Sequence, residues 1–163
     1  MGKRECGDCK VCCTLMGVTE ISKPRNVKCD MLCDTGCGSY ESRPPSCKDF
    51  KCMWLREDDL VQLTTKKEYV FRNMERPDRV GIMFDVGLPD SKFEKETGQR
   101  PLAAWETRPG AFKEPAAKEL IERLSKKVLL LMKPFGDGNK TVFAGPAALE
   151  KVVKKFVVKM EHG

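Results

Sequence analysis

The stretch Cys6-Gly7-Asp8-Cys9-Lys10-Val11-Cys12-Cys13, residues 6–13, opens a series of nine cysteines that ends at residue 52 of this 163-residue chain. The later cysteines are Cys29, Cys33, Cys37, Cys47 and Cys52. So one-sided a distribution marks a separate structural unit. We therefore predict a metal-binding module at residues 1–56 and an α+β domain at residues 57–163.

The spacing of the cysteines favours chelation over a disulfide framework. Two cysteines separated by two residues lie on a tight turn and can bind the same ion through both sulfurs. The count of nine is odd, and the basic start of the chain, with no apolar stretch behind it, predicts no secretion signal. Thiols stay reduced in the cytosol. We therefore predict a cytoplasmic protein whose cysteines hold metal.

Two kinds of metal centre remain open. Soft thiolate sites select zinc, copper(I) or iron–sulfur clusters. The run Cys6-x2-Cys9-x2-Cys12 matches the first three ligands of a bacterial ferredoxin cluster, but Cys13 follows at once and no Cys-Pro continues the run. A distant Cys47 or Cys52 could still complete a four-iron cluster. Zinc needs only four sulfurs in tetrahedral reach, so zinc is the predicted metal and an iron–sulfur cluster is the alternative.

Three segments together resemble the CxxCxxCC cysteine-cluster family, described as a zinc- or iron-chelating domain. The segments are CGDCKVCC at 6–13, KPRNVKC at 23–29 and GCGSYESRPPSCKDFKCMWL at 36–55. The resemblance covers residues 5–56. It implies metal binding by Cys6, Cys9, Cys12, Cys13, Cys37, Cys47 and Cys52, with Cys29 or Cys33 as a further ligand.

The ninth cysteine exceeds the usual number of ligands in this family. Cys29 follows the Lys23-Pro24 segment as in the family pattern, whereas Cys33 has no such local support. We therefore predict that Cys33 is a free thiol. The vicinal Cys12 and Cys13 point in different directions along most backbones, so either they serve different ions or one of them is a buried thiol.

The residues around the cysteines predict a small apolar cap. Tyr40, Phe50, Trp54 and Leu55 supply the large apolar side chains of this short module. Arg43 precedes Pro44-Pro45, a stiff extended segment. Two interpretations of Arg43 stay open: it neutralises thiolate charge, or it is solvated.

The second half of the chain predicts strands at 79–86, 101–107, 128–133 and 140–144, with a loop at 88–100. A helix opens at Glu114-Pro115, and a second helix follows Gly145-Pro146. The first carries an apolar stripe from Ala117 to Val128 at helical spacing. We therefore expect a small, mainly antiparallel sheet with two helices on one face. Charged residues at the strand ends, among them Arg76 and Glu106, predict ordinary salt bridging.

Charge and hydropathy exclude some partners. The formal net charge of +6 falls to about +2 if eight thiolates bind two zinc ions, so nucleic-acid binding is not expected. The longest apolar run, Val128–Met132, is far below the about 20 residues of a membrane span. We predict a non-catalytic protein that holds one or two zinc ions and has a role either in binding another protein or as an accessory. The alternative is an iron–sulfur or zinc enzyme of redox or protein-modifying type, since the family includes a flagellin lysine methylase.

Overall fold

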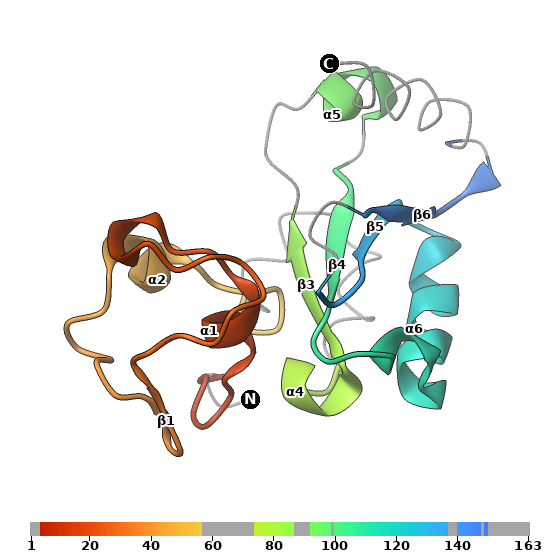
Figure 1. Ribbon diagram of the computed structural model, residues 1–163. Coiled ribbons are helices and arrows are strands. Elements are labelled where there is room, and N and C mark those ends of the chain that lie inside the picture. The colour runs from red at the N-terminus through yellow and green to blue at the C-terminus, as the bar shows by residue number, and fades with distance from the viewer. Residues whose placement is uncertain are drawn as a thin grey trace.

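The computed structural model describes residues 4–56, 74–86, 92–98, 100–136, 140–147 and 149. A four-stranded sheet stands between the cysteine-rich segment 4–56 on one side and helix α6 (Pro115–Ser125) on the other (Figure 1). Within the described ranges, none of the helices has the length and apolar character needed to cross a bilayer.

The cysteine-rich segment is built from very short elements. It contains the helix α1 (Val11–Leu15), the 3₁₀ turn η1 (Thr19–Ile21) and the helix α2 (Pro45–Asp49). A two-residue hairpin pairs β1 (Leu32–Cys33) with β2 (Gly36–Cys37) in antiparallel register. Pro45 starts α2 because its fixed φ suits the first helical position and it has no N–H to leave unpaired.

The sheet has the order β3-β4-β5-β6. Its strands are β3 (Ile82–Val86), β4 (Leu102–Glu106), β5 (Leu130–Lys133) and β6 (Val142–Ala144). The outer pairs are antiparallel, and β4 pairs with β5 in parallel. A parallel pair needs a crossover connection, and α6 lies in the one between β4 and β5. The predicted mixed α and β class is confirmed, whereas the parallel pair was not foreseen.

Three local predictions need correction or fall outside the description. Residues 79–80 belong to the helix α4 (Pro77–Val80), not to the strand, because Pro77 starts a helical turn and Gly81, at φ +81°, ends it. The expected loop at 88–100 contains the helix α5 (Lys92–Thr97). The second predicted helix, after Gly145-Pro146, lies largely outside the described residues.

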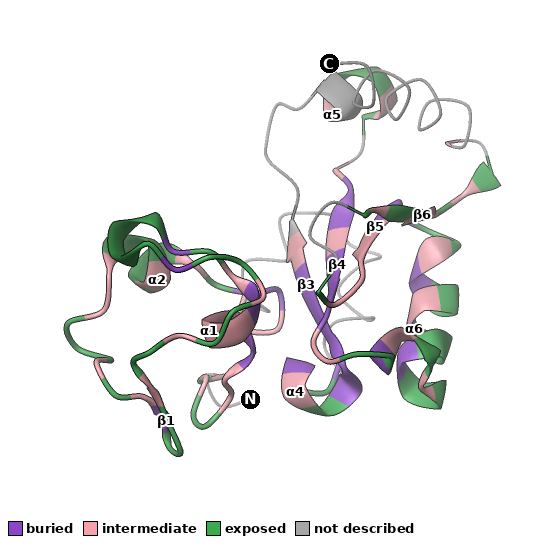
Figure 2. Ribbon diagram, viewed as in Figure 1, coloured by how far each residue is buried: buried purple, intermediate pink, exposed green. Residues whose placement is uncertain are grey.

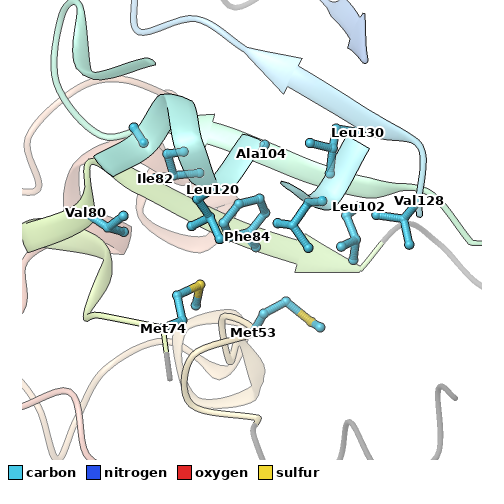
Figure 3. Close-up of a cluster of buried hydrophobic side chains, with 12 residues drawn as sticks. Met53, Met74, Val80, Ile82, Phe84, Leu102, Ala104, Leu120, Val128 and Leu130 are labelled. Carbon is cyan, nitrogen blue, oxygen red and sulfur yellow. The ribbon is translucent and has the colours of Figure 1, made fainter. Parts of the chain in front are cut away.

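One face of the sheet packs against α6. Strand alternation places Ile82 and Phe84 of β3 on this face, together with Ala104 of β4. The α6 side chains that meet them are Ala117, Leu120 and Leu124, three members of the predicted stripe. Figure 3 shows this cluster around Phe84, which has 0% exposure. The apolar periodicity of α6 therefore did predict the buried face of the helix.

The opposite face of the sheet packs against the cysteine-rich segment. Met83 and Trp105, paired across β3 and β4, form a second cluster with Val11, Leu15 and Cys52. Met53 donates its backbone N–H to the carbonyl oxygen of Phe84, at 2.9 Å. Ile82, Met83 and Phe84 are therefore all buried (Figure 2), because successive residues of β3 point to opposite layers. The two parts of the chain share an apolar interface.

Charged side chains at the strand ends form ion pairs at Arg76 and Arg108, as the sequence predicts, whereas Glu106 binds backbone N–H groups. Arg76 pairs with Asp78 at 2.7 Å, and Arg108 pairs with Glu114 at 2.5 Å. The buried Glu106 carboxylate accepts the backbone N–H groups of Phe112 and Phe135. These contacts fix the loops around the end of β4.

Candidate metal centre

Eight of the nine cysteines line one cavity of about 1600 Å³ within the cysteine-rich segment. We name it the thiol cavity. Its cysteines are Cys6, Cys9, Cys12, Cys13, Cys29, Cys37, Cys47 and Cys52, the eight residues that the sequence predicts as ligands. The structure thus brings the predicted set to one place. None of the nine cysteines, all of which are described, forms a disulfide.

Short local elements deliver these thiols to the cavity. Gly7, at φ +52°, makes the turn in which the Cys9 N–H donates to the Cys6 carbonyl oxygen at 2.9 Å. Helix α1 carries Cys12 and Cys13, and α2 carries Cys47. The Cys29 N–H donates to the Cys13 carbonyl oxygen at 3.0 Å, which fixes the returning chain beside α1.

The electrostatic neighbours of the thiols define a first group, here called set one: Cys6, Cys9, Cys12 and Cys52. Burial raises the pKa of the Cys52 thiol, and negative charge on Cys6 or Cys9 raises it further. Burial also raises the pKa of Cys9, where charge on Cys6 adds to the effect. These four thiols are electrostatic neighbours, and Cys13 also raises the pKa of Cys6 and of Cys12.

A second group, set two, contains Cys13, Cys29, Cys37 and Cys47. Burial raises the pKa of Cys47, and charges on Cys13, Cys29 and Cys37 raise it further. The backbone hydrogen bond between Cys29 and Cys13 joins two members of this set directly. Set two therefore also offers four sulfurs.

The vicinal pair Cys12–Cys13 links the two sets. The pKa of Cys13 is lowered to about 7, mainly by a hydrogen bond from the Cys12 thiol, with the charges of Lys23 and Arg43 adding to the effect against that of burial. The same hydrogen bond, together with burial, raises the pKa of Cys12. Charge on Cys6 and Cys9 also raises the pKa of Cys12, whereas Cys13 acts on Cys47 of set two.

The thiols do not yet form a closed coordination shell. Among the residues that the structure describes, no three cysteine, histidine, aspartate or glutamate side chains converge on a single metal position. Metal binding would therefore require the sulfurs of each set to move together. The donors themselves suit a soft metal, since every predicted ligand in both sets is a cysteine that lines the cavity.

Two residues without sulfur hold the ligand-bearing helices. The buried Lys23 ammonium donates to the carbonyl oxygens of Thr14, Met16 and Pro24, and so fixes the end of α1. The Glu20 carboxylate accepts from the backbone N–H of Ser46 at 3.0 Å and from its hydroxyl at 2.8 Å. Glu20 thus caps the helix that carries Cys47.

The loop between the first two cysteines is tied to the second half of the chain. Arg76 donates to the Asp8 carboxylate at 2.5 Å while it also holds Asp78. The Arg76 hydrogen bond and charge lower the pKa of Asp8. Sequence reasoning assigned no site role to Asp8, Glu20 or Lys23. Asp8 and its partner Arg76 are 68 residues apart in the sequence, and no local sequence pattern predicts such a contact.

The predicted aromatic cap is correct only in part. Phe50, Trp54 and Leu55 pack against the Met83–Trp105 cluster. Tyr40 does not belong to the cap: it is 52% exposed, and the Arg43 guanidinium stacks on its ring at 3.7 Å from the ring centre. A phenol beside a solvated hairpin has no apolar layer to enter, because the sheet face is already covered by α1.

Cys33 stands apart from the other eight cysteines. It is exposed and does not line the thiol cavity. Hydrogen bonds from the side chain and backbone N–H of Thr35 lower the pKa of its thiol. Its Sγ lies 3.2 Å from the carbonyl oxygen of Gly36 within the β1–β2 hairpin.

Comparison with known proteins gives no match: no family model, no curated protein and no solved structure matches this chain. The assignment of the thiol cavity therefore rests on its own residues.

Proposed function

We propose that the thiol cavity binds two zinc ions, one in set one and one in set two, and that the protein has a non-catalytic, accessory role toward another protein. One observation carries the proposal: eight cysteines, the number that two four-coordinate sites need, line a single cavity, while the ninth lies outside it. Structural zinc sites take four ligands in tetrahedral geometry, and all-cysteine shells are common among them.

The accessory role follows from the number of ligands. A zinc ion that is held by four thiolates has no open position for water or substrate, and catalytic zinc needs such a position. Three large apolar side chains at the cavity, Ile21, Met31 and Tyr40, are 42–52% exposed and offer contact area to a partner protein. A reducing compartment such as the cytoplasm would keep all eight ligands available as thiols.

An iron–sulfur cluster in set one is the second candidate. Cys52 senses the charges of Cys6 and Cys9, which makes it the distant fourth ligand that the ferredoxin-like spacing of Cys6, Cys9 and Cys12 would need. Such a cluster would favour the redox or protein-modifying enzyme. Either metal agrees with membership of the cysteine-cluster family that the motifs resemble.

Single cysteine replacements test the two-site arrangement. We expect about two zinc ions per wild-type chain and about one per chain in Cys52→Ser and in Cys47→Ser, because a hydroxyl is a poor ligand for a soft metal. The matched control, Cys33→Ser, should keep both ions. The measurement is metal per chain by elemental mass spectrometry after purification without oxygen.

Two outcomes would count against the zinc assignment. A brown preparation that contains iron and acid-labile sulfide would replace zinc by the iron–sulfur cluster in set one. Unchanged stoichiometry in both Cys52→Ser and Cys47→Ser would remove these two cysteines from the ligand set. Loss of metal in Cys33→Ser would show that the division into eight ligands and one free thiol is wrong.

Brief alkylation of the native protein should label Cys33 before the other cysteines. Its thiol is exposed and has a lowered pKa, and metal would protect the eight thiols of the cavity. Peptide mapping after a short reaction gives the order of labelling. Prompt labelling of Cys13 or Cys29 with protection of Cys33 would show that the labelled cysteine, and not Cys33, is the free thiol.

A further inference from the structure

Arg43 has a guanidinium that is fixed in place at the thiol cavity. It lies directly before Pro44, which restricts its backbone to extended conformations. Its Nη1 donates to the carbonyl oxygen of Tyr40 at 3.2 Å, and its guanidinium carbon lies 3.7 Å from the centre of the Tyr40 ring. Stacking and hydrogen bonding together hold the plane of the guanidinium, so its remaining N–H groups point in set directions.

The Nε–H of Arg43 is buried and has no hydrogen-bond partner among the described residues. Arg43 also lines the thiol cavity, as do the eight predicted ligand cysteines. Leaving a buried donor of a charged group unpaired costs free energy. An acceptor that forms only when metal binds, such as a thiolate sulfur, would remove that cost.

Arg43 differs from Lys23, another cation that lines the thiol cavity. Lys23 already donates to three carbonyl oxygens, whereas Arg43 keeps an N–H to give.

We propose that Arg43 is a positioning residue of the metal centre: its Nε–H donates to a ligand thiolate, and its charge offsets the negative charge of the filled cavity. This inference rests on the proposed zinc function. A zinc ion with four thiolates carries a net charge of about −2, so two neighbouring sites repel each other. A cation held at the cavity lowers that repulsion, and the hydrogen bond stabilises the thiolate form of one ligand.

Competition with a zinc chelator tests this role in the zinc-loaded protein. We expect Arg43→Gln to release its first zinc ion at a chelator concentration about 10–100-fold lower than wild type, the usual size of such an effect for a residue that orients a ligand. Arg43→Lys keeps the charge but loses the planar Nε donor, and should fall between the two. The matched control is Arg25→Gln, which removes a guanidinium stacked on the Trp105 ring outside the cavity lining.

Cobalt(II) gives a second readout that folding alone would not change. In the cobalt-substituted protein, loss of an N–H···S hydrogen bond should shift the sulfur-to-cobalt charge-transfer absorption in both Arg43 variants but not in Arg25→Gln. Zinc retention and cobalt spectra equal to wild type in Arg43→Gln and Arg43→Lys would overturn the inference. A wild-type protein that binds no zinc would overturn the proposed function itself, and with it any role of Arg43 toward zinc.

Discussion

Removal of the proposed zinc ions by a strong chelator should make residues 4–56 sensitive to protease while residues 100–136 stay protected. The cysteine-rich segment has helices of five residues and strands of two, too little regular structure to persist alone. Structural zinc contributes about 10–16 kcal/mol per site to folding in small zinc domains. The cluster between the sheet and α6, with Phe84 and Leu120, needs no metal.

The two tryptophans provide a continuous measure of this transition. Trp54 and Trp105 both belong to the cluster that joins the cysteine-rich segment to the sheet. Their fluorescence should move to longer wavelength on chelation and return when zinc is added back. Limited proteolysis with mass spectrometry identifies the cut sites. Equal protection of both parts after complete metal removal would contradict the prediction.

Phe84→Ala should lower the free energy of unfolding by about 3–5 kcal/mol, the range for a large aromatic side chain removed from a packed core. Phe84, a residue of β3, has 0% exposure and lies in the cluster that includes Leu120 of α6, shown in Figure 3. Denaturant unfolding followed by far-ultraviolet circular dichroism measures the loss.

The neighbouring residue provides the matched variant. Met83 is 1% exposed but faces the cysteine-rich segment instead of α6. Met83→Ala should lower the free energy of unfolding by about 2–5 kcal/mol. Its tryptophan fluorescence should change at a lower denaturant concentration than its circular dichroism, because the substitution loosens the layer that contains Trp54 and Trp105. The same order of events in both variants would show that the two faces of the sheet do not act as separate layers.

Periodic apolar patterns predicted the elements of the second half of the chain well. The expected strand 101–107 became β4 at Leu102–Glu106, and the helix expected from Pro115 begins there. Both depend on local signals: alternating apolar residues for a strand, a stripe at helical spacing and a proline at the first turn for a helix. The strand predicted from residue 79 was wrong at its start. Pro77 begins the four-residue helix Pro77–Val80 and Gly81 ends it, so turn geometry outweighed apolar alternation there.

The sequence alone determined the chemistry of the candidate site. The resemblance to the cysteine-cluster family named the thiols that line one cavity and favoured Cys29 over Cys33, which lies outside it. Spacing by itself points to Cys6, Cys9 and Cys12, because ligands two residues apart share a turn.

Only the tertiary structure decided how the cysteines group and what holds them. Cys52 joins Cys6 and Cys9, and Glu20 caps the helix of Cys47 from 26 residues away. The tertiary structure also placed Met83 and Phe84, which are neighbours in sequence, in two different layers. The physical reason is that such contacts depend on where distant segments pack, and a side chain's local sequence does not encode the partner that folding will bring to it.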